Sequence, residues 1–242
     1  MHGTQHNTSD NQTRKQVGNK RAISENWRGS LYVHAQIDSH VPRKEPGDWA
    51  LEISGSILAT EQTGFRAGDD SVAEIGIVKA FLIQIREARR EGLQASAVLN
   101  AKSFATSEYS QLFKKLEWRK RVSRKFEPRS ADLLILDRME LKPEYRGHGF
   151  GLLAARCVIE MFGSRCGLVA CKPYPLQFEG SNRWRPPARV SGATKALRGA
   201  RKKLRRYWAR VGFQRVPRTM LYALAPKRGL PSFGQMLGAK SK

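Results

Sequence analysis

Residues 131–151 read Ala-Asp-Leu-Leu-Ile-Leu-Asp-Arg-Met-Glu-Leu-Lys-Pro-Glu-Tyr-Arg-Gly-His-Gly-Phe-Gly, and this stretch decides the fold. Its first half, up to Leu141, is an apolar run typical of a buried strand, and an apolar helix pattern begins at Leu152. A strand, a glycine-rich turn and a helix in this order present unpaired backbone N–H groups at the positive end of a helix, which suits a phosphate. Glycines at alternate positions let the backbone approach such an anion closely.

The glycine spacing alone fits several kinds of turn. A Walker-type loop ends in Gly-Lys-Ser/Thr, whereas Gly149-Phe150-Gly151 leads directly into Leu152. A Rossmann turn has the spacing Gly-x-Gly-x-x-Gly near the start of a βαβ unit, whereas these glycines alternate. An ordinary tight connection between a strand and a helix also has this composition.

The order Arg-x-x-Gly-x-Gly over Arg146–Gly151, preceded by Leu-Lys-Pro-Glu-Tyr, resembles the acyl-CoA-binding motif of the GNAT superfamily of N-acetyltransferases. The resemblance covers residues 132–224 and is weak upstream of Asp132. Beyond the turn it includes an apolar helix, the next parallel strand, a late helix that ends in Gly-Phe and a closing strand: Leu152–Phe162, Gly167–Cys171, Lys203–Phe213 and Met220–Leu224. The resemblance implies an α/β fold, a GNAT-like mixed, partly splayed β-sheet flanked by helices.

The same resemblance implies acetyl-CoA as co-substrate and the amine of an unidentified acceptor as the second substrate. In the family, the backbone of the strand before the loop pairs with the pantetheine arm; by position these residues are Met139, Glu140 and Leu141. The loop amides hold the pyrophosphate; the matching residues here are Arg146, Gly147, His148, Gly149, Phe150 and Gly151. Arg146 adds a positive charge, and the His148 side chain is expected to point to solvent.

Acetyl transfer needs a deprotonated amine, a polarised thioester carbonyl and a proton for the departing thiolate. Alternate residues from Leu133 to Leu141 are apolar except Asp137, so one face of the strand carries a single carboxylate. A buried carboxylate is costly without a partner. Asp137 is therefore predicted to be a general base with a raised pKa, or else to form a salt bridge with Arg156 or Arg138. Glu140, on the opposite face, is a second candidate.

The proton donor for the thiolate is harder to place. The family often has a tyrosine four residues before the glycine of the late Gly-Phe, and that position here is Trp208. An indole is no useful acid, so the neighbouring Tyr207 is the candidate, with protonation by solvent as the alternative. The other interpretation makes Trp208 a core residue and Tyr207 a surface aromatic.

The charge of the chain is strongly positive and uneven. The formal net charge is +23 and the sequence pI is about 10.6. From Gly180 to Lys242 there are seventeen Lys and Arg and no Asp or Glu, and a second basic cluster lies between Lys114 and Arg129. Such asymmetry favours a polyanionic partner such as RNA, or else serves solubility alone. Aromatic residues within the basic stretches would suit stacking on bases: Trp118, Phe126, Trp184, Tyr207 and Trp208. A nucleic-acid- or ribosome-associated binding protein without turnover is therefore the alternative function.

Upstream of the motif, alternation predicts three strands and two helices: Leu31–Ile37, Trp49–Leu58, Ala73–Ile85, Glu87–Gly92 and Ser96–Leu116, the last with Val98, Phe104 and Leu112 on its buried side. A turn is expected at Gly64–Asp70. Downstream, Thr194–Val211 is predicted as the late helix. Lys172–Gln177 either borders the acceptor pocket or is a rigid turn.

The expected organisation is one domain with two tails. Residues 1–28 are polar and predicted disordered, residues 29–226 form the acyltransferase domain, and residues 227–242 form a loose basic tail. There is no apolar run of membrane-spanning length and no signal pattern, so a cytoplasmic protein without a membrane partner is expected. The three cysteines lack metal-ligand spacing and are predicted to be small buried hydrophobes, and no metal site is expected: Cys157, Cys166 and Cys171.

Overall fold

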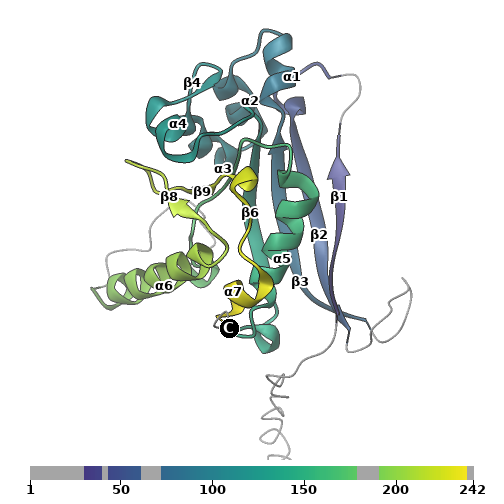
Figure 1. Cartoon of the computed structure of the whole chain (residues 1–242), viewed down its shortest axis with the longest axis vertical. Coiled ribbons are helices and arrows are strands. Elements are labelled where there is room, and N and C mark those ends of the chain that lie inside the picture. Colours follow the sequence, from purple (N-terminus) through teal and green to yellow (C-terminus); the bar gives the residue numbers. More distant parts are fainter. Residues whose placement is uncertain (1–29, 40–42, 61–71, 179–190, 239–242) are drawn as a thin grey trace, which may run out of the picture.

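The computed structural model describes residues 30–39, 43–60, 72–178 and 191–238, which form one mixed α/β domain (Figure 1). The strands of its main sheet are Ser30–Asp38 (β1), Ala50–Thr60 (β2), Ala73–Ile83 (β3), Leu133–Leu141 (β6), Leu168–Cys171 (β7), Gln214–Arg215 (β8) and Tyr222–Leu224 (β9). They lie in the order β1-β2-β3-β6-β7-β9-β8, and every neighbouring pair is antiparallel except β6 and β7. The expected mixed sheet is therefore present, with mostly antiparallel pairing.

Helices cover both faces of this sheet. They are Ile85–Arg90 (α1), Ala95–Lys102 (α2), Phe104–Ser107 (α3), Lys120–Phe126 (α4), Phe150–Val158 (α5), Ser191–Ala209 (α6) and Phe233–Leu237 (α7). Leu133 and Leu168 pack into a core shared with α1, α2 and α4. Leu134 and Val169, which point the other way, pack against α5 and the end of α6. Burial on both faces explains why β6 and β7 are continuous apolar runs.

The three N-terminal strands and the strand–turn–helix–strand unit lie where the sequence predicts them, within a few residues. The third strand ends at Ile83, because the fully buried Ile85 already begins α1. The late helix and the closing strand are also confirmed as α6 and β9. The predicted tail at residues 1–28, the predicted turn at Gly64–Asp70 and residues 239–242 lie outside the described residues.

The predicted long helix at Ser96–Leu116 is wrong. The chain forms α2, breaks at Ser103, and continues through α3, a 3₁₀ turn and a small hairpin of Phe113–Lys114 (β4) with Glu117–Trp118 (β5). Ser103 is extended, and its hydroxyl accepts a hydrogen bond from the Thr106 N–H, so a local cap replaces the continuous helix. Phe104, predicted to be buried, is 60% exposed as a result.

The predicted loose basic tail is also wrong for residues 230–238. Ser232 and Gln235 form a reciprocal capping box that begins α7. Met236 is fully buried, and the Arg156 guanidinium lies 4.4 Å from the centre of the Phe233 ring. The apolar residues between the basic ones thus attach this segment to α5.

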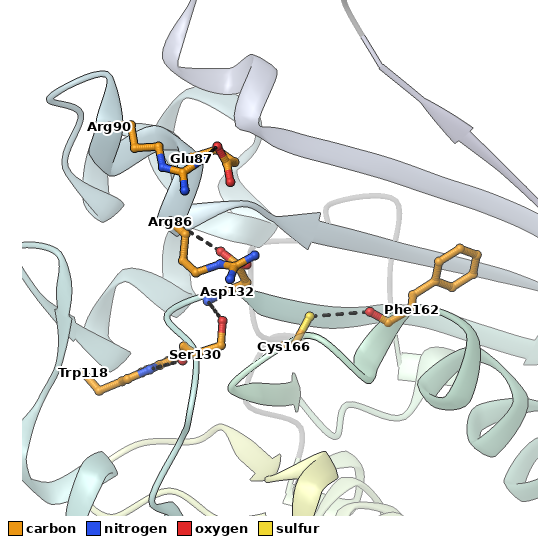
Figure 2. Close-up of polar contacts among 8 residues, drawn as sticks. All are labelled: Arg86, Glu87, Arg90, Trp118, Ser130, Asp132, Phe162 and Cys166. Atoms are coloured by element: carbon orange, nitrogen blue, oxygen red, sulfur yellow. Dashed lines mark hydrogen bonds and ion pairs between the residues drawn. The ribbon is translucent and has the colours of Figure 1, made fainter.

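The start of β6 is fixed by a polar network (Figure 2). The buried Asp132 accepts hydrogen bonds from the backbone N–H and the Nε of Arg86, both at 2.9 Å. Its own N–H donates to the Ser130 hydroxyl, and the Trp118 indole N–H donates to the Ser130 carbonyl at 2.8 Å. Trp118 also stacks on Phe113, so its role is structural and the prediction that it stacks on bases is not supported.

Two of the three cysteines are buried small residues, as predicted, and the third is half-buried. Burial raises the pKa of the Cys166 thiol to about 12, and its Sγ lies 3.5 Å from the Phe162 carbonyl oxygen (Figure 2). In the described part of the chain, no helix is long and apolar enough to cross a membrane, and no cluster of His, Cys, Asp or Glu is arranged to hold a metal ion.

Candidate functional site

A cavity opens where the two parallel strands part. β6 and β7 pair from Leu133 opposite Leu168 to Leu136 opposite Cys171, and β6 then continues to Leu141 without β7. The space beside this free edge is a cavity of about 1010 Å³. Its walls are the second half of β6, the glycine turn, residues between Cys171 and Phe178, and one side of α6. It therefore has a strand end, where β6 and β7 part, and a turn end, at the start of α5.

A β-bulge at Asp137 shapes the strand end. In the pairing of β3 with β6, Lys79 lies opposite Arg138 and Ala80 lies opposite Leu136, so Asp137 is an extra residue. A bulge bends its strand and interrupts the alternation of side chains. Leu136 before the bulge and Met139 after it consequently face the same core.

The bulge corrects the prediction for Asp137. There is no single apolar face from Leu133 to Leu141, because residues before and after the bulge face opposite layers. Asp137 is half-buried and lines the cavity, as a base for the acceptor amine requires. The predicted partner Arg156 instead forms an ion pair with Glu160, with Nε to Oε1 at 2.7 Å.

Glu140 lies between two guanidinium groups at the cavity wall. Its Oε2 is 3.1 Å from Arg138 Nη1, and its Oε1 is 4.0 Å from Arg146 Nη2. Arg146 Nε also donates to the Leu141 carbonyl at 2.8 Å. These contacts hold Arg146 at the junction of β6 and the glycine turn, so Glu140 acts here as a positioning group for Arg146.

The three glycines of the turn serve different needs. Gly147 and Gly149 have φ of +90° and +85°, values that residues with a side chain rarely adopt. The Gly149 carbonyl accepts hydrogen bonds from the N–H groups of Leu152 and Leu153, which begins α5. Gly151 has no room for a Cβ, because that atom would collide with the Tyr207 hydroxyl.

The residues predicted to bind CoA fall into two groups, those that line the cavity and those that do not. Met139, Glu140, Leu141, Arg146, Gly147 and Gly151 all line the cavity. His148 is exposed, as expected, and its ring centre lies 6.1 Å from that of Phe150. The Phe150 side chain is buried against Ile57, so only its backbone is available to a ligand.

Tyr207 lies at the turn end of the cavity, half-buried, with its hydroxyl over the first turn of α5. Burial raises the pKa of Tyr207 to about 12, although the Arg210 charge and a backbone hydrogen bond from Leu152 act to lower it. The phenol is therefore protonated at neutral pH. Trp208 is 9% exposed and packs edge-on against Phe213, so the interpretation of Trp208 as a core residue is confirmed, whereas Tyr207 is no surface aromatic.

Sequence reasoning missed Tyr109, a buried residue of the 3₁₀ turn Glu108–Leu112. Its pKa is raised well above 10, first by burial and then by the charges of Cys171, Asp137 and Glu108, while a backbone hydrogen bond from Lys172 lowers it. Tyr109 therefore lies near Asp137 and Cys171 in the core behind the strand end, and it is not among the wall residues of the cavity. Its local sequence carries no signal, since the contact depends on a break in the predicted helix.

The segment after β7 borders the cavity, so Lys172–Gln177 is part of a pocket wall, and that this pocket takes the acceptor stays a prediction. Lys172, Tyr174 and Leu176 line the wall. Lys172 Nζ is 2.5 Å from Glu108 Oε1, an ion pair that joins this segment to the layer of α3. The Arg201 guanidinium lies 5.1 Å from the centre of the Tyr174 ring, which joins the segment to α6.

A scan against models of known protein families, a search of curated proteins and a search of solved structures each gave no match to this chain. The residues of the cavity are therefore the basis for assigning a function.

Proposed function

We propose that this protein is an acyl-CoA-dependent N-acetyltransferase that moves an acetyl group from acetyl-CoA to the amine of an acceptor. The observation that supports this most is that the free edge of β6 and the first turn of α5 open into the same cavity. One ligand can therefore meet an unpaired strand edge and a helix N-terminus together. CoA has the matching parts, an amide-bearing pantetheine arm and a pyrophosphate.

The pantetheine arm is proposed to extend along Met139–Leu141. A chain with amide groups can add to a free strand edge as a further strand would. The pyrophosphate is proposed to lie at the turn end, against the N–H groups at the start of α5. Arg146 of the turn and Lys203 of α6, which both line the cavity, supply positive charge. The cavity volume of about 1010 Å³ is at the upper end of the range for ligand pockets, about 300–1,000 Å³.

The reaction is proposed to take place at the strand end, beside the bulge. The amine nitrogen attacks the thioester carbonyl, the C–N bond forms, the C–S bond breaks, and CoA leaves as the thiolate. Asp137 takes the proton from the amine, because its carboxylate lines the cavity there. Backbone N–H groups of β6 polarise the thioester carbonyl.

Two tyrosines are candidates for giving a proton to the thiolate. Tyr207, predicted from the sequence, has its hydroxyl at the first turn of α5, which suits a hydrogen bond to a phosphate oxygen. Tyr109 lies near Asp137 and Cys171, where the sulfur is proposed to lie. Tyr109 is 3% exposed and is not among the wall residues of the cavity, so we assign protonation of the thiolate to solvent and Tyr207 as a phosphate contact.

A transfer assay tests this function. Purified protein is incubated with acetyl-CoA and a panel of small amines, amino acids, peptides and RNA, and release of the free thiol is followed together with products 42 Da heavier. Transfer to at least one acceptor is expected, about 10²–10⁴ slower in Asp137→Asn. Binding of CoA without transfer or hydrolysis on any panel member would favour the binding protein without turnover.

A further inference from the structure

Helix α6 has two different sides. One side lines the cavity, and the last turn buries Trp208 against the sheet. The opposite side carries four exposed cations, here called the α6 stripe: Lys195, Arg198, Lys202 and Arg206. At about 100° per residue they fall within an arc of roughly 80°, and at about 1.5 Å per residue they extend over roughly 16 Å. The stripe is thus a narrow, straight row of positive charge.

The α6 stripe has no counter-ions among the described residues. The chain from Gly180 onward contains no Asp or Glu, so α6 has no acidic neighbour in sequence. Arg86 and Arg156, in contrast, pair with Asp132 and Glu160. Like charges on successive turns destabilise a helix. A row of cations without counter-ions therefore favours binding of a polyanion from outside the chain.

We propose that the α6 stripe binds the phosphate backbone of an RNA duplex. A nucleic-acid strand carries a regular row of charges, one per roughly 3.4 Å of axis, which a straight row of cations matches. Every member of the stripe is Lys or Arg, the side chains that neutralise phosphates, and the stripe contains no Asn or Gln, which pair with adenine through a donor and an acceptor. We therefore expect the stripe to contact mainly the phosphate backbone.

The aromatic residues decide between a duplex and a single strand. Single strands are held by bases stacked on exposed aromatic rings. Among the described aromatic residues of the basic stretches, Trp118 is stacked on Phe113, Phe126 is buried, Tyr207 packs against the core and Trp208 packs against Phe213, so none of these rings is free for bases; Trp184 lies outside the described residues. A duplex needs only charge along its backbone.

The groove geometry favours RNA over DNA. The major groove of A-form RNA is deep and narrow, which brings its two rows of phosphates together, so the cations of one helix can serve both rows. The major groove of B-DNA, about 12 Å wide, instead admits a whole helix and exposes base edges to it. A single narrow row of four cations matches two rows of phosphates that lie close together better than it matches a groove wide enough for the whole helix.

A second basic region extends the footprint. Lys125 of α4 donates from Nζ to the Arg215 carbonyl of β8 at 2.9 Å, and β8 follows α6 closely in the chain. Figure 1 shows α6, β8 and α4 one after another along the same side of the molecule. Exposed Lys120 and Arg124 of α4 continue the row of positive charge. If the proposed function holds, RNA bound on α6 lies behind one wall of the cavity and carries the acceptor amine. The RNA-binding proposal itself does not depend on the proposed function.

Fluorescence anisotropy with a labelled 20-base-pair RNA duplex tests the proposal, with DNA of the same sequence as comparison. Four phosphate contacts give a slope of about −3.6 in log–log plots of affinity against salt, hence a loss of roughly a hundredfold between 50 and 200 mM. RNA is expected to bind more tightly than DNA. Equal affinity for the two duplexes, or tighter binding of single-stranded RNA, would overturn the assignment to duplex RNA.

Two charge-matched variants locate the surface. Arg198→Glu/Lys202→Glu and Lys44→Glu/Arg165→Glu each lower the formal net charge from +23 by 4. All four residues are exposed, and only the first pair belongs to the stripe. The stripe variant is expected to lose at least tenfold in RNA affinity and the other less than threefold. Equal losses would mean that only net charge matters. CoA affinity, measured by calorimetry, is expected to be unchanged in both variants. If the wild-type protein binds RNA but does not bind CoA, the proposed function is contradicted and the RNA-binding proposal is not.

Discussion

Replacing Gly151 by Ala tests the contact between Tyr207 and the first turn of α5. The new Cβ would collide with the Tyr207 hydroxyl, whereas the next nearest atoms, including Leu141 Cδ1, lie 3.6 Å away. Overpacking of a buried site costs about 1–3 kcal/mol, against a gain of about 1 kcal/mol for Ala over Gly inside a helix. The variant is therefore expected to lose about 0–2 kcal/mol in free energy of unfolding.

The same substitution in a Tyr207→Phe background should behave differently. Phe lacks the colliding oxygen, so the helix preference remains and Gly151→Ala is expected to stabilise by up to about 1 kcal/mol. The coupling between the two sites is then about 1–3 kcal/mol. Gly199→Ala is the control, because Gly199 lies on α6 with no atom within 4 Å of its added Cβ, and it should stabilise in both backgrounds.

Urea unfolding at neutral pH measures all of these variants, and thermal unfolding gives a second readout at about 2–4 °C per kcal/mol for a chain of this size. A Gly151→Ala effect that is the same with Tyr207 and with Phe at that position would refute the contact. It would also remove the argument that Tyr207 lies beside the proposed phosphate site.

Three further results are expected. Asp137→Asn should lower turnover about 10²–10⁴-fold with CoA affinity near wild type, and a normal rate across pH 6–9 would make Asp137 structural. Raising the pH from 10 to 12 should lower the free energy of unfolding, because the pKa of Tyr207 is about 12 in the folded protein and the unfolded chain loses that proton first. The loss due to Tyr207 is at most about 1.4 kcal/mol per pH unit and should be absent in Tyr207→Phe. Identical pH profiles of the two proteins would contradict this expectation. Met236→Ala should cost about 2–5 kcal/mol in free energy of unfolding, because Met236 is the fully buried residue of α7. A change below about 0.5 kcal/mol, which is usual for surface sites, would mean that residues 230–238 are a loose tail.

The sequence predicts those elements whose signal is local. The apolar runs of β6 and β7, the glycine turn and the late helix α6 follow from periodicity and from backbone chemistry, and all are present. The candidate CoA residues from Met139 to Gly151 were assigned from the resemblance of this stretch to the GNAT motif, and six of them line the cavity.

The features that the sequence did not predict depend on partners far along the chain. The bulge at Asp137 arises in the pairing of β6 with β3, and no property of β6 alone indicates it. Tyr109 lies near Asp137 only because Ser103 ends α2 and caps α3. α7 is stabilised by burial of Met236, which the short sequence between the basic residues Arg228 and Lys240 does not indicate.

Calorimetric titration of CoA into the wild-type protein and Arg146→Gln tests the central claim most directly. Arg146 is held at the turn by the Leu141 carbonyl and Glu140, and Arg165→Gln, at an exposed arginine outside the cavity, is the control. One CoA is expected to bind per chain, with at least tenfold lower affinity, about 1.4 kcal/mol, in Arg146→Gln alone. No binding at millimolar CoA, or the same affinity in all three proteins, would contradict the assignment of the cavity to acyl-CoA.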